Sequence, residues 1–436
     1  MALNPSIMQA VEQLGYRVTV GDVAAQAGLN VNLAEQGLLA LATEAGGHLQ
    51  VAQSGDIVYL FPKNFQAILR NKFLRLRLQE WWKKVWKVLF YLIRISFGIV
   101  LLLSIALIFL TIIAIITAAN QGSNSSDNRG HSHGGGGSIF MPYFWLGPDW
   151  FWFFAPDYGS PQYRRRRERE QNQLNFFEAI FSFLFGDGNP NADLEERRWQ
   201  QIAIVIRNNQ GAVVAEQISP YLENIGEGYS REYEDYMLPV LTRFNGKPEV
   251  SPDGQIVYYF PELQTKAQHR HPLAVPAYLQ ELTWRFSSAS SEQIMMATGL
   301  GGLNFVGALV LGNLLAGPAA AKIGGLVAFV HSIYWLLLGY GTAFLGVPLI
   351  RYFWIQWRNS KIAVRNRQRQ ERVLQLSQAD AALDNKIAYA RQFAAETVIG
   401  REDLAYTTET DLLEQEADNS AQIEAEWQRR LRQSGS

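Results

Sequence analysis

A twelve-residue phrase occurs twice in this chain, with a long apolar run between its copies, and this pattern constrains the fold more than any other feature. The phrase reads VAQSGDIVYLFP where it begins at Val51 and VSPDGQIVYYFP where it begins at Val250. The agreement indicates a duplicated soluble domain interrupted by membrane segments. The alternative is two unrelated hairpins that share common strand residues. The matching residues are Val51, Gly55, Ile57, Val58, Tyr59, Phe61 and Pro62 in the first copy and Val250, Gly254, Ile256, Val257, Tyr258, Phe260 and Pro261 in the second.

The first copy, expected over residues 1–68, has the pattern of a small α+β domain. Apolar residues at helical spacing predict three helices, over 5–14, 22–27 and 31–44, and Thr19 or Gly21 and then Asn30 are suitable N-caps for the last two. Strands over 48–52 and 57–61 flank a Ser-Gly pair, which is a short hairpin signal. Three short helices followed by a β-hairpin resemble a winged helix. The repeated phrase then contains the second strand of the wing, and its tyrosines are structural rather than catalytic.

The second copy, expected over residues 195–265, repeats this plan more loosely. A helix is expected to start at Ile202, a second covers 216–222, and a third covers 236–244. The insertion ENIGEGYSREYED separates the last two helices, and Asp253 and Gly254 form the hairpin turn. Both copies are therefore predicted to be winged-helix-like domains.

The first membrane segment follows directly after the first copy. Residues 70–94 are predicted to form a basic amphipathic juxtamembrane helix, with Arg94 positioned to snorkel to the membrane surface. Residues 95–118 carry no charge, and at about 1.5 Å per residue they exceed the roughly 30 Å hydrocarbon core, which predicts a transmembrane helix rather than a buried core helix. The expected membrane-interface residues of this region are Trp81, Trp82, Trp86 and Arg94.

Two further apolar stretches, 294–316 and 323–350, predict a helical membrane hairpin. The first is rich in glycine, which lets membrane helices approach closely, and Asn304 and Asn313 are placed to hydrogen-bond across such a contact. Packing is the expected role of these glycines, and they do not by themselves indicate a pore. The expected interface residues that follow the hairpin are Arg351, Trp354 and Trp357.

The remaining segments are linkers and a tail. Residues 119–138 form a Gly/Ser/Asn linker, in which His131 and His133 are expected to be solvated rather than bound to a metal. Residues 139–190 are predicted to be an aromatic interfacial or re-entrant segment followed by an amphipathic helix; an aromatic plug against a partner protein is the alternative. Its expected interface residues are Trp145, Trp150 and Trp152. Residues 351–436 read as a basic and then mixed-charge helical tail that is solvated or pairs with another helix.

Three basic clusters, at 70–94, 164–169 and 351–372, flank these membrane segments. The positive-inside rule assigns all three to the cytoplasmic side, together with the N-terminal domain. A single crossing at 95–118 would put the second copy on the opposite face. The duplication therefore favours the hypothesis that residues 139–155 return the chain across the membrane.

The composition excludes several kinds of chemistry. The chain has no cysteine, so thiolate metal sites, cysteine nucleophiles and cysteine-ligated iron–sulfur clusters are excluded. Phosphate-loop, dinucleotide, H-E-x-x-H, EF-hand and nucleophile-elbow motifs are absent from the sequence. The acidic group Glu232, Glu234 and Asp235 lies in a polar insertion and is expected to be solvated. We therefore expect a non-enzymatic protein without a cofactor, a catalytic residue or a metal site.

Charge also argues against DNA binding by the two domains. A winged helix that reads DNA presents Arg or Lys on its third helix and wing. Here the third helix, VNLAEQGLLALATEA, has no basic residue. Residues 1–64 contain two basic and five acidic side chains, and residues 199–264 contain four and nine. This surface favours a protein partner over nucleic acid.

The phrases GYRVTVGDVAAQAGL and GDIVYLFPKNF resemble a little-characterised family of membrane proteins from cyanobacteria and chloroplasts. Some plant members are described as iron–sulfur cluster biosynthesis family proteins. The resemblance implies a plasma or thylakoid membrane location and a role in assembling or maintaining membrane complexes. Because cysteine is absent here, no ligands for an iron–sulfur cluster are carried over.

The sequence thus predicts an α-helical membrane protein with two small α+β winged-helix-like domains and a helical C-terminal tail. Its expected work is scaffolding or assembly, with membrane lipid and proteins as partners; a homo-oligomer is compatible with the sequence. The alternatives are a membrane-tethered nucleic-acid-binding regulator and a transporter or channel subunit. For the last, His331 is the only ionisable side chain within the apolar runs, where a packed histidine is the expected state.

Overall fold

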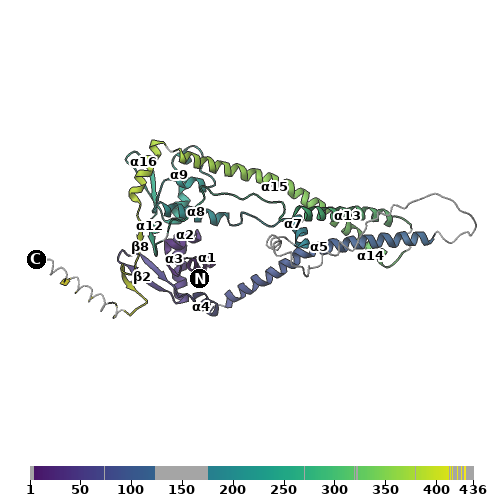
Figure 1. Cartoon of the computed structure of the whole chain (residues 1–436), viewed down its shortest axis with the longest axis horizontal. Coiled ribbons are helices and arrows are strands. Elements are labelled where there is room, and N and C mark those ends of the chain that lie inside the picture. Colours follow the sequence, from purple (N-terminus) through teal and green to yellow (C-terminus); the bar gives the residue numbers. More distant parts are fainter. Residues whose placement is uncertain are drawn as a thin grey trace, which may run out of the picture. The chain divides into compact units, whose positions relative to one another are not determined.

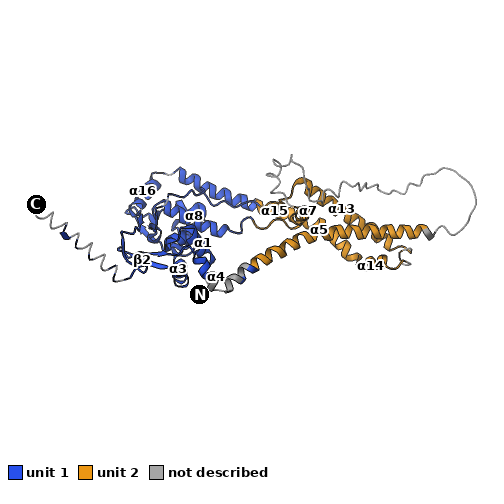
Figure 2. Cartoon of the chain, turned by 60° about the horizontal axis from the view of Figure 1, so that its bottom comes forward, with its two compact units in different colours: residues 1–81, 190–283, 360–436 blue, residues 82–189, 284–359 orange. Residues whose placement is uncertain are grey.

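The computed structural model describes residues 4–72, 74–122, 175–269, 271–318, 320, 323–378 and 380–411, with six positions between 413 and 428. The chain is mostly helical, with small sheets (Figure 1). It divides into two compact units (Figure 2). Unit 1 comprises residues 1–81, 190–283 and 360–436, and unit 2 comprises residues 82–189 and 284–359. Both copies of the repeat lie in unit 1.

The first copy follows the predicted order of elements, with an added strand before the second helix and a further helix after the hairpin. Thr19 accepts a hydrogen bond from the Asp22 N–H and completes a capping box, so of the two predicted caps it is Thr19 that starts the second helix. Asn30 caps the third helix, as predicted. Glycines in the left-handed conformation end both helices. The elements are α1 (Pro5–Gln13), β1 (Arg17–Thr19), α2 (Val20–Ala27), α3 (Val31–Ala45), β2 (His48–Ala52), β3 (Ile57–Leu60) and α4 (Phe65–Lys72).

The second copy repeats this order, with a longer first helix, which begins at Leu194 rather than at the expected Ile202, and mostly shorter elements after it. Its predicted second and third helices each divide into an α-helical and a 3₁₀ part, and the insertion contributes one short helix. The elements are α8 (Leu194–Asn208), β4 (Ala212–Val213), α9 (Ala215–Ile218), η3 (Ser219–Tyr221), α10 (Tyr229–Glu232), η4 (Asp235–Met237), α11 (Leu238–Phe244), β5 (Lys247–Val250), β6 (Ile256–Tyr259) and α12 (Pro261–Gln264).

Each copy has an antiparallel sheet with the same core arrangement. The first sheet has the order β1-β3-β2-β9 and the second has the order β4-β6-β5. In both, the strand before the second helix pairs with the last strand of the hairpin. The fourth strand of the first sheet, β9 (Leu404–Thr407), comes from the C-terminal region and pairs with β2.

The C-terminal region differs from the expected helical tail. The helix α15 (Tyr334–Ser377) ends well before the terminus, and Asp380 caps a separate helix, α16 (Ala381–Ala390). A 3₁₀ turn, η6 (Arg391–Phe393), then leads to β8 (Thr397–Val398), which pairs in parallel with β7 (Thr265–Lys266), and to β9. The tail is therefore folded onto both copies, because its strands find backbone partners there.

In the described part of the chain, three helices are long and apolar enough to cross a membrane: residues Trp81–Asn120 within α5 (Leu74–Gly122), α13 (Ser291–Leu315) and α15. The basic segment 70–94 and the apolar run 95–118 share the continuous helix α5 from Leu74 onward. The stretch 323–350, expected as one helix, is divided at Ile333 into α14 (Leu326–Ser332) and α15.

Within unit 2, Gly301 and Asn304 make close helix contacts of the kind that the sequence predicts, whereas Asn313 is exposed. A Cβ on Gly301 would lie 2.4 Å from the Phe344 ring, so only glycine permits this approach of α13 to α15. The fully buried Asn304 donates to Ser104 Oγ of α5 over 2.7 Å. The apolar helix α7 (Phe176–Phe185) packs against α13 through Phe183 and its neighbours, so one of its faces is buried within protein.

Candidate functional site

The repeated phrase forms equivalent hairpins in the two copies. Gly55 and Gly254 adopt positive φ angles of 88° and 78° at the turns. Tyr59 and Tyr258 are both buried. Two residues further on, the backbone N–H of Phe61 donates to Tyr16 O, just before β1, over 2.8 Å. In the second copy the N–H of Phe260 donates in the same way to Gly211 O, just before β4, over 2.8 Å. These residues support the fold. Of the other residues in the repeat, Ile57 and Val250 are exposed, Val51, Ile256 and Pro62 are half-buried, and Pro261 begins α12.

A buried ion pair joins the two copies. Asp22 Oδ1 lies 2.7 Å from Arg207 Nη2, and Asp22 Oδ2 accepts backbone hydrogen bonds from Thr19 and Ala267, each over 3.0 Å. Burial alone would raise the pKa of the Asp22 carboxyl, but Arg207 and these N–H groups outweigh it and hold the pKa below its ordinary value. The copies therefore form one structural body with a shared hydrophobic core.

The second copy places another arginine against the first. The Arg243 guanidinium lies 4.4 Å from the centre of the Trp199 ring and donates to Gly28 O over 2.9 and 2.6 Å. A Cβ on Gly21 would lie 1.8 Å from Glu262 O, so α2 can lie this close to α12 only because residue 21 is glycine. Arg207 and Arg243 therefore both bind groups of the first copy, and neither is available to bind a phosphate.

The outer face of α3 is the most prominent candidate docking surface of the first copy. Leu33 and Leu39 expose 58% and 49% of their surface on a helix whose opposite side is fully buried. We define the α3 face as Asn32, Leu33, Glu35, Gln36, Leu39 and Thr43, all of which are exposed. It contains two apolar side chains, one carboxylate and no basic residue. The face therefore lacks the basic side chains that a phosphate backbone would require.

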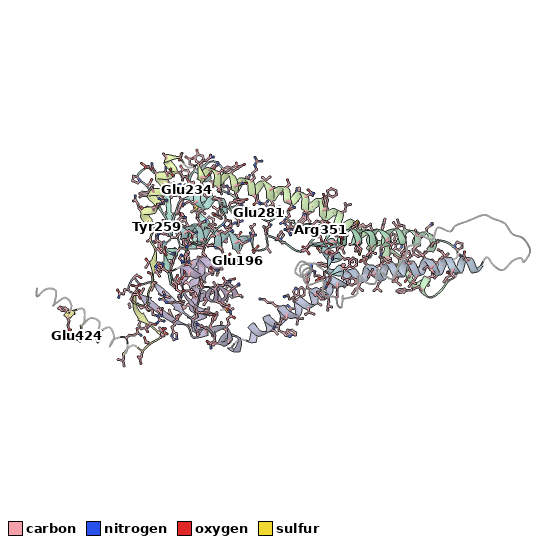
Figure 3. All side chains as sticks on the ribbon, viewed as in Figure 1. Glu196, Glu234, Tyr259, Glu281, Arg351 and Glu424 are labelled. Atoms are coloured by element: carbon pink, nitrogen blue, oxygen red, sulfur yellow. The ribbon has the colours of Figure 1, made fainter. Side chains whose placement is uncertain are left out.

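A polar cluster fixes α16 to the second copy. Lys386 Nζ, on a side chain that is 6% exposed, lies 2.9 Å from Glu216 Oε1 and 2.6 Å from Glu234 Oε1. Tyr258 donates to the other oxygen of Glu234 over 2.8 Å (Glu234 is labelled in Figure 3). Burial and Glu234 raise the pKa of the Tyr258 hydroxyl far above its ordinary value. Because Lys386 lies between the carboxylates of Glu216 and Glu234, this cluster ties α16 to the second copy.

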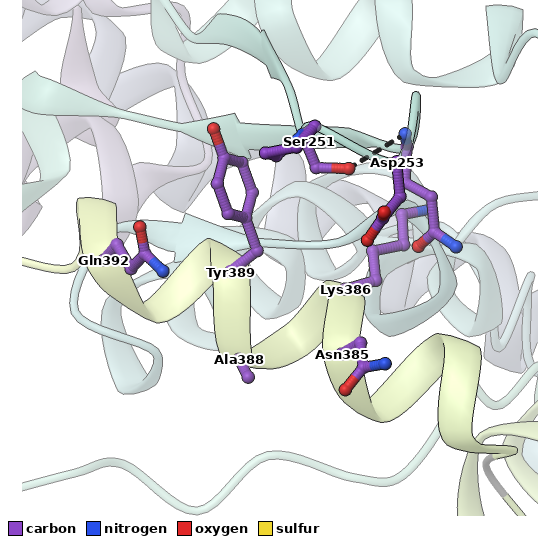
Figure 4. Close-up of a pocket in the computed structure, with 9 residues that line it drawn as sticks. Ser251, Asp253, Asn385, Lys386, Ala388, Tyr389 and Gln392 are labelled. Carbon is purple, nitrogen blue, oxygen red and sulfur yellow. Dashed lines mark hydrogen bonds between the residues drawn. The ribbon is translucent and has the colours of Figure 1, made fainter.

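A cavity of about 250 Å³ lies beside this cluster, between the β5–β6 turn and α16. In Figure 4, Lys386 and Tyr389 rise from α16 toward the turn, whereas Asn385 and Ala388 point away from it. The lining is about equally polar and apolar and presents no pair of groups arranged as nucleophile and base. In the described part of the chain, no three His, Asp or Glu side chains gather as a metal site. The lining residues are Ser251, Pro252, Asp253, Gln255, Asn385, Lys386, Ala388, Tyr389 and Gln392.

The membrane-interface residues predicted on α5 have two different surroundings. Trp81, Trp82 and Trp86 are exposed. Arg94 instead forms ion pairs with Glu178 and Asp187, at 4.0 and 3.6 Å, so its charge is met by carboxylates of the protein.

On α15 the predicted interface residues contact the segment that precedes α13. The Arg351 guanidinium stacks on Phe286 at 4.5 Å, and Arg358 lies between Trp284 and Trp354, at 4.9 and 5.1 Å from their ring centres. Trp357 is exposed. Trp145, Trp150, Trp152, His131 and His133 lie outside the described residues.

Sequence reasoning missed a second buried ion cluster within unit 1. The Glu281 carboxylate accepts hydrogen bonds from Arg365 Nε and from Nη1 of the fully buried Arg369, each over 2.8 Å. Asn366 pairs with both the N–H and the C=O of Glu281, at 3.0 and 2.8 Å. Arg365 and Arg369 lie one helical turn apart, and this spacing was the signal in the sequence that two arginines share one face of the helix. It did not identify their partner, Glu281, which lies 84 or more positions away in sequence.

Comparison with known proteins gives one informative match. The chain is 37% identical over 439 aligned positions to an Arabidopsis thaliana protein named "Uncharacterized protein At5g03900, chloroplastic". The alignment covers 98% of this chain and 82% of the plant protein. No family model and no solved structure matches the chain. The match supports a plastid-related family and does not extend to the cyanobacterial or iron–sulfur description that the sequence resemblance suggested.

Proposed function

Because this chain belongs to the family of the chloroplastic Arabidopsis protein, we propose that it is a non-enzymatic integral protein of a plasma or thylakoid membrane that docks protein partners and supports their assembly. The membrane location is supported by the three helices long and apolar enough to span a bilayer. The paired polar groups and close glycine contacts of these helices favour an anchor over a pore.

The element order supports a winged-helix-like fold for each copy. Helix, strand, two helices and a hairpin follow one another in the first copy, and the early strand lies beside the last. The second copy keeps the same strand order. In such a fold α3 takes the place of the helix that DNA-binding members use for recognition.

Both copies belong on the same side of the membrane, because they share one hydrophobic core and the Asp22–Arg207 ion pair. The chain has no native cysteine, so single-cysteine variants report topology cleanly. Ser54→Cys and Asp253→Cys occupy equivalent exposed turn positions. A membrane-impermeant maleimide should label both from one face of sealed vesicles. Labelling from opposite faces would contradict this arrangement.

The observation that carries the docking proposal is the α3 face, with two exposed leucines and no basic residue. The runner-up function, a membrane-tethered regulator that binds nucleic acid, requires Lys or Arg on this face. Arg207 and Arg243 contact the first copy instead.

Affinity purification from gently solubilised membranes tests the proposal. The wild-type chain should recover protein partners, and Leu33→Ser with Leu39→Ser should lose them. Leu238→Ser is the matched control, since Leu238 is 59% exposed on the shorter helix α11. Recovery of only the bare chain would contradict docking, and salt-dependent recovery of DNA would favour the runner-up.

A further inference from the structure

We propose that unit 2 carries a binding site for an anionic phospholipid, in which Arg358, held between Trp284 and Trp354, donates hydrogen bonds to the phosphate of the headgroup. The site is independent of docking through the α3 face and rests on the proposed membrane location. Three features support it: the contacts that hold Arg358, the difference between two pairs of cations on α5 and α15, and the exposed apolar side chains between these pairs.

The Arg358 guanidinium is held by aromatic rings and not by a carboxylate. It lies 4.9 Å from the centre of the Trp284 ring and 5.1 Å from that of Trp354. The two rings are 5.3 Å apart at an angle of 80°. Asn359 accepts from the Trp284 N–H over 2.8 Å and donates to the Trp284 C=O over 2.9 Å, which fixes this segment on α15. Because the rings attract the cation through its flat face, its N–H groups remain available as donors.

The inner pair of cations in unit 2, Arg94 and Arg351, is enclosed by the protein (Arg351 is labelled in Figure 3). Arg94 pairs with Glu178 and Asp187 over 4.0 and 3.6 Å. Arg351 packs against Gly186, the residue before Asp187, where an added Cβ would lie 2.3 Å from its Nη1. Both arginines thus reach the same turn after α7, one from α5 and one from α15.

The outer pair, Lys87 and Arg358, has different surroundings. Each lies seven residues beyond the inner arginine of its own helix, which is about 10 Å of rise. Both are exposed, and among the described residues neither forms an ion pair. Since the inner arginines meet at one turn, the outer pair lies on one side of the membrane.

Between the two pairs, both helices still present apolar side chains to their surroundings. Val88 and Leu92 expose 62% and 53% of their surface on α5, and Phe353 exposes 64% on α15. Trp86 and Trp354, next to the outer pair, are exposed as well, and Trp is enriched at the membrane–water interface. A phospholipid covers the apolar side chains and neutralises the cations together, whereas a soluble polyanion would leave the apolar side chains in water.

The chemistry of Arg358 favours a headgroup with a net negative charge. A planar guanidinium can donate two parallel hydrogen bonds to one phosphate. A zwitterionic headgroup carries its own ammonium group, which competes for that phosphate. Lys87 adds attraction for an anionic surface.

Native mass spectrometry of the full chain in a neutral detergent tests the site, with phosphatidylglycerol and phosphatidylcholine of the same acyl chains as probes. The first phosphatidylglycerol should bind with a lower dissociation constant than the first phosphatidylcholine, and excess inorganic phosphate should not displace it. Equal affinities would overturn the proposal. Displacement by inorganic phosphate, or by a single-stranded oligonucleotide, would show a site for soluble anions and would also overturn it.

The variant Arg358→Gln should weaken binding of phosphatidylglycerol about fivefold, which corresponds to about 1 kcal/mol. Arg367→Gln is the matched control, because Arg367 is exposed on the same helix and pairs with Glu371 over 3.2 Å. Arg358→Lys should recover only part of the affinity, since an ammonium lacks the planar fork of the guanidinium. Full recovery with lysine, no loss with Arg358→Gln, or an equal loss in the control would overturn a site built around Arg358.

The membrane location is tested separately by washing membranes with alkaline carbonate, after which a spanning chain stays in the pellet. If the chain stays there and binds both lipids alike, the lipid site is overturned and the membrane location stands. If carbonate releases the chain, both the location and the site are overturned.

Discussion

Replacing Asp22 by Asn should destabilise the contact between the two copies more than any surface substitution. The change removes the negative partner of Arg207 while keeping the size of the side chain. It also leaves a guanidinium that is only 13% exposed without its ion pair. Breaking a buried pair in this way costs about 3–5 kcal/mol. The capping box of α2 is weakened as well.

At about 2–4 °C per kcal/mol for a domain of this size, the midpoint of thermal unfolding should fall by at least roughly 6 °C. Circular dichroism of the full chain in detergent measures the midpoint, and hydrogen exchange in α2 and α8 locates the loss. Asp253→Asn is the matched control, because it makes the same chemical change in an exposed turn. A shift no larger than that of the control would refute the reasoning.

The effect should also depend on pH in a defined direction. The folded-state pKa of Asp22 lies below its ordinary value of about 3.9, so the ionised carboxylate contributes stability above about pH 4. That contribution is lost as the pH falls through the folded-state pKa. The difference in unfolding midpoint between wild type and Asp22→Asn should therefore be largest near pH 7 and should become smaller below about pH 4. A gap that widens in acid would contradict the assignment.

Two further substitutions test other parts of the fold. Lys386→Met leaves Glu216 and Glu234 without their shared cation, so the hydrogen-exchange rate in α16 should rise at least about tenfold while the rate in α3 is unchanged. Equal exchange rates in α16 of the variant and the wild type would show that Lys386 does not hold α16 on the second copy. Gly301→Leu should cost about 1–3 kcal/mol, measured as a lower unfolding midpoint, because its Cβ would meet the Phe344 ring. Gly302→Leu, with nothing within 4 Å, is the control, and an equal effect of both would contradict the packing.

Local signals in the sequence were enough to predict the first three helices and the hairpin of the first copy. Thr19 and Asn30 act as caps because a capping side chain needs only its own neighbours. The hairpin turns at Gly55 and Gly254 follow from the same kind of signal. The exposed, non-basic character of the α3 face was also readable, since helical periodicity separates its buried and outer sides.

Features that depend on distant partners could not be predicted. The strand β9 exists because it pairs with β2, more than 350 positions earlier in the chain, so its own sequence reads as part of a mixed-charge tail. Asp22 and Arg207 are 185 positions apart and each is ordinary in its local sequence. The break at Ile333 interrupts a run that hydropathy alone treats as continuous.

Site-specific photo-crosslinking in intact membranes tests docking through α3 most directly. A benzophenone side chain at Gln36 lies at the centre of the α3 face, and one at Glu249 on β5 serves as the control. Docking through α3 should give a discrete protein adduct from position 36 that disappears with Leu33→Ser and Leu39→Ser and is absent from position 249. No adduct at position 36, or an adduct with nucleic acid there, would contradict it.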